Sequence, residues 1–109
     1  MGIQSSTLTA SAVNNRVATS YPIEKGTLVA ASAEISDLAI LSSRIWARIS
    51  IAIDGTAPEN IVATLAQGNI GSGVSLPWTG AIKCQPNYKL LLETWGRSAT
   101  TVKLKSITE

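Results

Sequence analysis

The sequence predicts an all-β protein, an antiparallel two-sheet sandwich of the jelly-roll kind with seven or eight strands. Three observations support this fold class: strict period-two alternation in the clearest segment, turn-forming residues at short intervals, and no helical period along the chain. Many short strands separated by turns are typical of sandwiches and barrels. With 109 residues, the chain is long enough for one core and too short for two domains.

The clearest strand covers Ser43–Ile53, where apolar and other residues alternate. The apolar positions would face the core: Ile45, Ala47, Ile49, Ile51 and Ile53. The remaining positions would form the opposite face: Arg44, Trp46, Arg48, Ser50 and Ala52. A strand with one apolar face and one mixed face is typical of an antiparallel sheet.

The other strands are expected between turn signals such as Asp54-Gly55 and Pro86-Asn87. They are Thr7–Val13, Arg16–Ile23, Thr27–Ile35, Asn60–Gln67, Val74–Lys83, Tyr88–Trp95 and Ala99–Ile107, and Leu38–Leu41 could extend the clearest strand backward. In the last of them Val102, Leu104 and Ser106 would be buried. Residues 1–15 form either an extended N-terminal arm or a weak first strand, and residues 16–109 form the sandwich domain.

The glycines at 68, 71 and 73 predict a loop between two strands. A phosphate-binding loop would need the GxGxxG spacing or a following Gly-Lys-Ser/Thr, and the segment has neither. We therefore expect no nucleotide site there.

Composition narrows the possible partners. Charged residues make up only 15% of the chain, against about 25% in an ordinary soluble domain, and the net charge is +2 without a basic run. Nucleic acid is therefore not an expected partner. No apolar stretch is long enough to span a bilayer, so we expect a soluble chain that is not conventionally secreted. A weakly charged surface suits permanent packing in a homo-oligomer. The solvated surface of a secreted or bacterial domain would have the same low charge content.

The residue inventory argues against catalysis. The chain has no histidine, which removes the commonest general base and metal ligand, and its single cysteine, Cys84, excludes an internal disulfide and a structural zinc site. Most of the carboxylates lie at expected turns or termini, whereas Glu93 lies within a strand, where we expect it to be solvated or ion-paired. We predict no catalytic, cofactor-binding or metal-binding residues, with calcium at loop oxygens around Asp54 and Glu59 left open.

Tryptophan and arginine supply the candidate partner-binding residues. They are Arg44, Trp46, Arg48, Trp78, Trp95 and Arg97. The row around Trp46 could offer cation–π stacking and hydrogen-bond donors to a partner. The interpretation we favour is that a second sheet covers Trp46 as part of a core, and that Trp78 and Trp95 close the ends of the sandwich.

The C-terminal third has the segments Leu76-Pro77-Trp78-Thr79-Gly80-Ala81-Ile82 and Pro86-Asn87-Tyr88-Lys89-Leu90-Leu91-Leu92-Glu93-Thr94-Trp95-Gly96, followed by a last strand. This pattern resembles small jelly-roll phage virion proteins, namely capsid decoration or cement proteins and tail-associated sandwich domains. The resemblance implies a multicopy virion component that binds capsid or tail protein through its arm and loops.

These observations leave three functional hypotheses. The first is a non-catalytic virion component, such as a capsid decoration or cement protein, assembled in the host cytoplasm. The second is a carbohydrate- or receptor-binding module with Trp46, Trp78 and Trp95 as platforms for sugar rings. The third is an oligomeric scaffold without a ligand, a soluble cytoplasmic protein if it is not viral.

Overall fold

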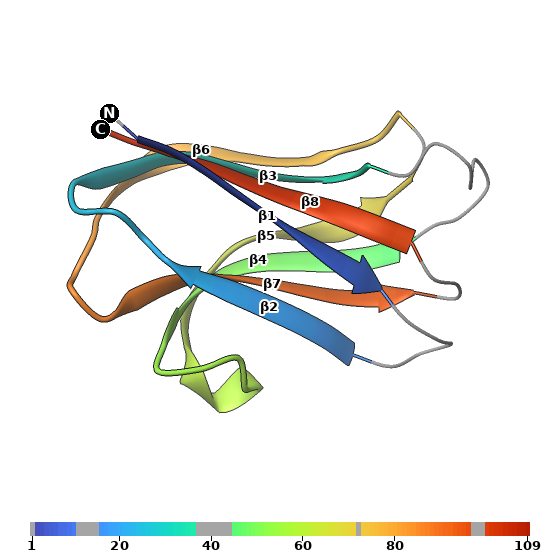
Figure 1. Ribbon diagram of the computed structural model, residues 1–109, viewed down its shortest axis with the longest axis horizontal. Helices are drawn as coiled ribbons and strands as arrows, with labels where there is room; N and C mark the ends of the chain where they lie inside the picture. The colour runs from blue at the N-terminus through green and yellow to red at the C-terminus, as the bar shows by residue number, and fades with distance from the viewer. Residues whose placement is uncertain (1, 11–15, 37–44, 72, 97–99) are drawn as a thin grey trace.

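The protein is a sandwich of two four-stranded antiparallel sheets (Figure 1). The computed structural model describes residues 2–10, 16–36, 45–71, 73–96 and 100–109. One sheet has the order β1-β8-β3-β6 and the other β2-β7-β4-β5. The strands are β1 (Gly2–Ala10), β2 (Arg16–Pro22), β3 (Thr27–Ile35), β4 (Ile45–Ile53), β5 (Ile61–Ile70), β6 (Leu76–Lys83), β7 (Tyr88–Gly96) and β8 (Thr100–Thr108).

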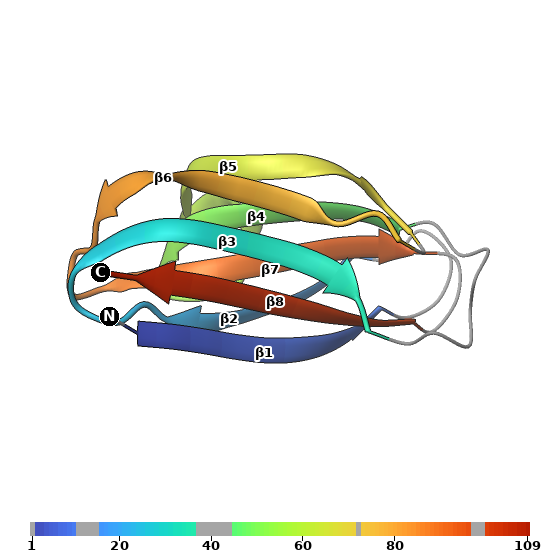
Figure 2. The same cartoon turned by 90° about the horizontal axis from the view of Figure 1, so that it is seen from above.

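The strand order confirms the jelly-roll expectation. Every connection crosses from one sheet to the other except that between β4 and β5, which contains the short 3-10 turn η1 (Pro58–Asn60). Two interleaved Greek keys produce this order in an eight-stranded jelly roll. Figure 2 shows the two sheets one behind the other, with β1 and β6 at the two edges of the nearer sheet.

The core lies between the sheets and is built from aliphatic side chains that alternate along each strand. In β4, Ile45, Ala47, Ile49 and Ile51 are at most 1% exposed, which confirms the predicted core face of this strand. The facing sheet contributes Leu28, Val102 and Leu104, all fully buried. Ser106 is buried next to the same core and hydrogen-bonds the Tyr21 hydroxyl at 2.8 Å, so the burial pattern expected for β8 is also confirmed.

Two strands, β1 and β5, differ most from the boundaries expected for them. The first strand is β1, which starts at Gly2 and pairs with β8 along its whole length, instead of starting at Thr7. β5 continues through Gly68 to Ile70, because Ile70 is buried against the core and pairs with Ile45, so the expected loop starts later. Residues 37–44, which include the possible extension Leu38–Leu41, lie outside the described residues.

The packing of Trp78 explains why position 80 of β6 is a glycine. Trp78 packs against the core, and its six-membered ring lies over Gly80, where a Cβ atom would come 2.6 Å from the indole Cζ2. Glycine is therefore needed so that the indole can lie flat along its own strand. Across the described part of the chain, no helix is long and apolar enough to cross a membrane.

Candidate partner-binding site

The outer face of the β2-β7-β4-β5 sheet is the candidate site. Its side chains point away from the other sheet, and they divide into a covered half and an open half. Figure 1 shows the segment between β4 and β5 folded beneath this sheet, on the side away from its partner sheet. The covered half lies at the end of β4 where that segment begins, and the open half lies at the start of β4.

The covered half behaves as a second small core. Ser50 and Ala52 of β4 and Leu91 of β7 have no exposed surface, although all three lie on the outer face. Among the described residues, the Ser50 hydroxyl is the one buried side-chain polar atom without a hydrogen-bond partner. The covering segment, residues 54–60, is held in a compact turn by a hydrogen bond, 3.1 Å long, from the Asn60 side-chain amide Nδ2 to the Asp54 backbone carbonyl oxygen.

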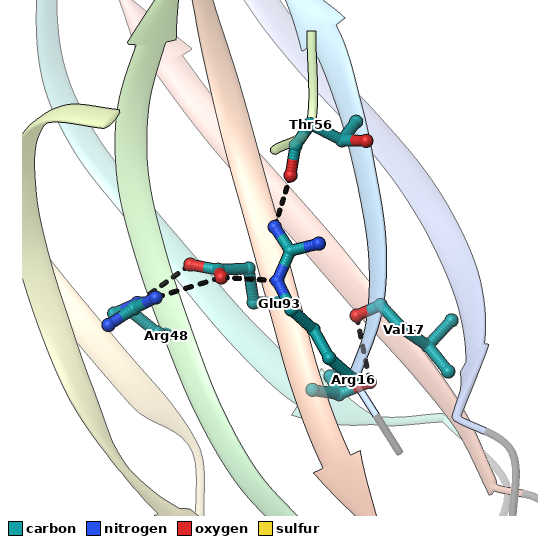
Figure 3. A network of polar contacts seen from close by, with 6 residues as sticks. Arg16, Val17, Arg48, Thr56 and Glu93 are labelled. Carbon is teal, nitrogen blue, oxygen red and sulfur yellow. Dashed lines mark hydrogen bonds and ion pairs between the residues drawn. The ribbon is translucent and has the colours of Figure 1, made fainter. Parts of the chain in front are cut away.

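Two arginines share one buried carboxylate at the border between the two halves (Figure 3). Arg48 of β4 lies directly opposite Glu93 of β7 and donates Nε to Oε1 at 2.6 Å and a terminal nitrogen to Oε2 at 2.8 Å. Arg16 of β2 approaches from the other side and donates Nε to Oε2 at 2.7 Å. The Glu93 side chain has no exposed surface, whereas each arginine side chain is 26% exposed.

Arg16 also anchors the covering segment. Its second guanidinium nitrogen donates to the backbone carbonyl oxygen of Thr56, which lies between β4 and η1 (Figure 3). One side chain therefore joins β2, the buried carboxylate and the segment that closes the covered half. The network fixes the position of the cations as well as that of the loop.

The network keeps Glu93 ionised. Burial by itself would raise the pKa of Glu93, but the hydrogen bonds and positive charges of Arg48 and Arg16 outweigh it, so the pKa lies below its usual value. The pKa of Arg48 is raised, chiefly by its hydrogen bond to Glu93. A carboxylate held as an anion by two cations cannot act as a proton donor near neutral pH, so this cluster is an ion pair and not an acid catalyst.

The open half presents an aromatic surface beside this network. The Arg48 guanidinium carbon lies 5.4 Å from the centre of the Trp95 ring, within cation–π range. Trp46 lies directly opposite Trp95 on the neighbouring strand and is 41% exposed. Because Arg48 is fixed by Glu93 and stacks on Trp95, Trp46 stands at the edge of a preorganised surface.

The structure therefore brings together three of the six candidate residues: Trp46, Arg48 and Trp95. The favoured interpretation of Trp46 is wrong, because the second sheet packs against the Ile45 and Ala47 face of β4 and leaves Trp46 outside. Trp95 does not close an end of the sandwich but lies half-buried on the outer face, and Trp78 belongs to the other sheet and packs against the core. Arg44 and Arg97 lie outside the described residues.

Two residues of the site were not among the candidates. Nothing in the sequence distinguishes Arg16 from the other scattered basic residues, and Glu93 was expected to be solvated or ion-paired. Their contact joins positions 77 residues apart, and only the pairing of β2 with β7 brings them together. The period-two pattern of β7 did place Glu93 and Trp95 on one face, which was the available signal.

A hollow at one end of the sandwich is separate from this site. Its lining includes Ile23, Cys84 and Pro86 with Lys25 and Lys83. Burial raises the pKa of the Cys84 thiol, with a hydrogen bond to the Leu28 backbone acting in the opposite direction, so the thiol stays protonated near neutral pH. Among the described residues, no three His, Cys, Asp or Glu side chains gather where they could hold a metal ion.

Comparison with known proteins supports the fold and not a family. No protein-family model and no curated protein sequence matches the chain. A mitogen from Yersinia pseudotuberculosis has a similar structure, with a TM-score of 0.55 and 10% identity over 99% of this chain and 86% of that one. A Sulfurospirillum deleyianum protein, GEBA250068378, gives a TM-score of 0.51 and 9% identity over 100% and 99% of the two chains.

A more distant likeness is to a chain of infectious bursal disease virus, Gx strain. The TM-score is 0.41 and the identity 14%, over 97% of this chain and 32% of that chain. The mitogen and the Sulfurospirillum protein share their fold with this chain, and at 10% and 9% identity that shared fold is all the comparison establishes.

Proposed function

We propose that this chain is a non-catalytic binding protein that attaches to neighbouring protein subunits through Trp46, Arg48 and Trp95. The observation that carries the proposal is the exposed Trp46 beside an arginine whose position is fixed by a buried carboxylate. Tryptophan and arginine are the residues most enriched at the energetic centres of protein interfaces. Side chains that are already held in place lose less conformational entropy when a partner binds them, which favours affinity.

The finer form of the proposal is a multicopy virion component, such as a capsid decoration or cement protein. The jelly-roll fold is common among viral capsid domains. The low charge content of 15% means that little charged surface must be desolvated when subunits pack permanently. In this proposal the chain is made in the host cytoplasm and resides in the virion.

The test is to look for the chain in purified virus particles from its source and to measure its binding to particles that lack it. Quantitative mass spectrometry should find many copies per particle. In sedimentation, the purified chain alone should remain small, whereas mixed with depleted particles it should pellet with them. Spontaneous assembly into large shells would instead indicate a scaffold, and a chain absent from all particles would contradict the virion proposal.

A second candidate, a carbohydrate-binding module, is favoured by one observation. Trp46 and Trp95 lie opposite each other on a single face, which is how paired platforms for sugar rings would be arranged. Arg48 already covers the Trp95 ring, so Trp46 is the platform that remains available. Retention on a glycan column that is lost in Trp46→Ala, together with no binding to particles, would select this candidate.

A further inference from the structure

We propose that β1 is an open sheet edge at which a second copy of this chain adds its own β1, extending the β1-β8-β3-β6 sheet across a two-fold axis. The inference rests on the fold and is independent of the proposed function. Sheet edges expose unpaired backbone groups that pair readily with other strands, and most proteins block them with charge, proline or bulges. The four edges of this sandwich differ in this respect.

Three of the four edges carry such blocking features. β2 has Arg16 at its start and Pro22 at its end. β6 has Pro77 near one end and Lys83 at the other. β5 has no charge, but its pairing with β4 shifts register twice, between Ile49 and Ser50 and between Ile51 and Ala52, so its ladder is irregular.

The β1 edge carries none of them. Its nine residues, GIQSSTLTA, include no charge and no proline, and they pair with β8 without a register shift from Gly2↔Thr108 to Ala10↔Thr100. Figure 2 shows β1 as the outermost strand on its side of the sandwich. Ile3 on this strand is 65% exposed, more than any other large apolar side chain among the described residues.

β1 is also held firmly in the sheet. The Gln4 side chain donates to the Pro22 carbonyl oxygen at 2.9 Å and accepts from the Glu24 backbone nitrogen at 3.1 Å. These bonds tie β1 to the end of β2 in the other sheet. A strand already extended and fixed loses little entropy when it pairs with another.

Charge indicates a second copy as the occupant. In an antiparallel pair about a two-fold axis at Ser6, each residue i lies opposite residue 12 − i of the other copy, so all nine residues are paired. A charged strand would repel itself in this arrangement, whereas β1 places Ser5 opposite Thr7 and creates no like-charge pair. One strand-to-strand joint covers less than the roughly 1,200 Å² of a stable interface, so we expect a weak, concentration-dependent dimer.

The test compares wild type with charge variants at two exposed positions of β1, Ser5 and Thr7. Analytical ultracentrifugation should show a monomer–dimer equilibrium for wild type. S5K/T7K and S5E/T7E should each raise the dimer dissociation constant by at least about tenfold. An equimolar mixture of the two variants should restore the dimer, because opposite charges then face each other.

The matched control places the same charges on a blocked edge. T79K/A81K changes two exposed positions of β6 and should leave the wild-type dimer unchanged. Circular dichroism checks that each variant is folded. A wild type that stays monomeric at high concentration, a dimer that survives S5K/T7K, or an equal loss in T79K/A81K would each overturn the proposal.

Discussion

Arg48 and Glu93 lie directly opposite each other on β4 and β7 and share two hydrogen bonds, 2.6 and 2.8 Å long. This pair lies at the border between the covered half and the open half of the outer sheet face. The Arg48 guanidinium that binds Glu93 also stacks on Trp95 in the open half. Arg16 completes the neutralisation of Glu93 from the opposite side.

Removing both arginines should cost more stability than the two single changes together. Arg16→Ala and Arg48→Ala each leave Glu93 with one cationic partner, whereas the double variant leaves a fully buried carboxylate alone. An unpaired buried charge costs about 3–5 kcal/mol. Urea unfolding of the four proteins forms a double-mutant cycle, and simple additivity would show that Glu93 is less buried than we describe.

The contribution of Glu93 should disappear in acid. Its pKa is lowered in the folded protein, so its stabilising effect is complete above the unfolded value of about 4.5 and is lost as the pH falls through the folded pKa. The difference in unfolding free energy between wild type and Glu93→Gln should therefore be constant near neutral pH and shrink below about pH 4.5. A difference that grows in acid would mean that the folded pKa is raised.

Leu91→Ala should destabilise the protein as strongly as Leu92→Ala, by about 2–5 kcal/mol, although the two side chains point to opposite faces of the sheet. Leu92 fills the core between the sheets, whereas Leu91 lies on the outer face and is equally buried, which we attribute to the segment that joins β4 to β5. Chemical denaturation of the two variants and the wild type measures both losses in the free energy of unfolding. A cost below about 1 kcal/mol for Leu91 would indicate that this segment does not cover the outer face.

Gly80→Ala should destabilise the protein by about 1–3 kcal/mol, because the added methyl group displaces the Trp78 ring. Gly68→Ala is the matched control within another strand, since its Cβ would meet its nearest neighbour, Leu76, at an ordinary 3.6 Å. Thermal unfolding followed by tryptophan fluorescence reports both stability and the position of the indole. Equal effects of the two substitutions would contradict the packing described for Trp78.

The sequence was sufficient for the fold class and for the buried face of β4, because the strict alternation of Ile45 to Ile51 is a local signal. It could not show whether the opposite face of β4 is covered as well, so Trp46 was assigned to a core, whereas it is 41% exposed. The same limit applies to Leu91, which lies on the outer face of its sheet and is nevertheless fully buried. Only strand pairing reveals such long-range contacts.

The same reasoning from the sequence identified only part of the candidate site. Trp46 and Arg48 were recognised because they are neighbours on one face of one strand. Arg16 could not be connected to them, because β2 and β4 do not pair and meet only through β7. Period-two patterns describe the faces of single strands, whereas the site is assembled across three strands in an order that the pattern does not contain.

The most direct test of the account is particle binding by Trp46→Ala compared with Val74→Ala. Both side chains are large and exposed, at 41% and 55%, but Val74 lies outside the Trp46, Arg48 and Trp95 surface. We predict that Trp46→Ala remains as stable as wild type and loses at least about tenfold in affinity for depleted particles, which corresponds to about 1.4 kcal/mol. Val74→Ala should bind as wild type does. Undiminished binding by Trp46→Ala, or an equal loss in both variants, would contradict the assignment of this face as the binding site.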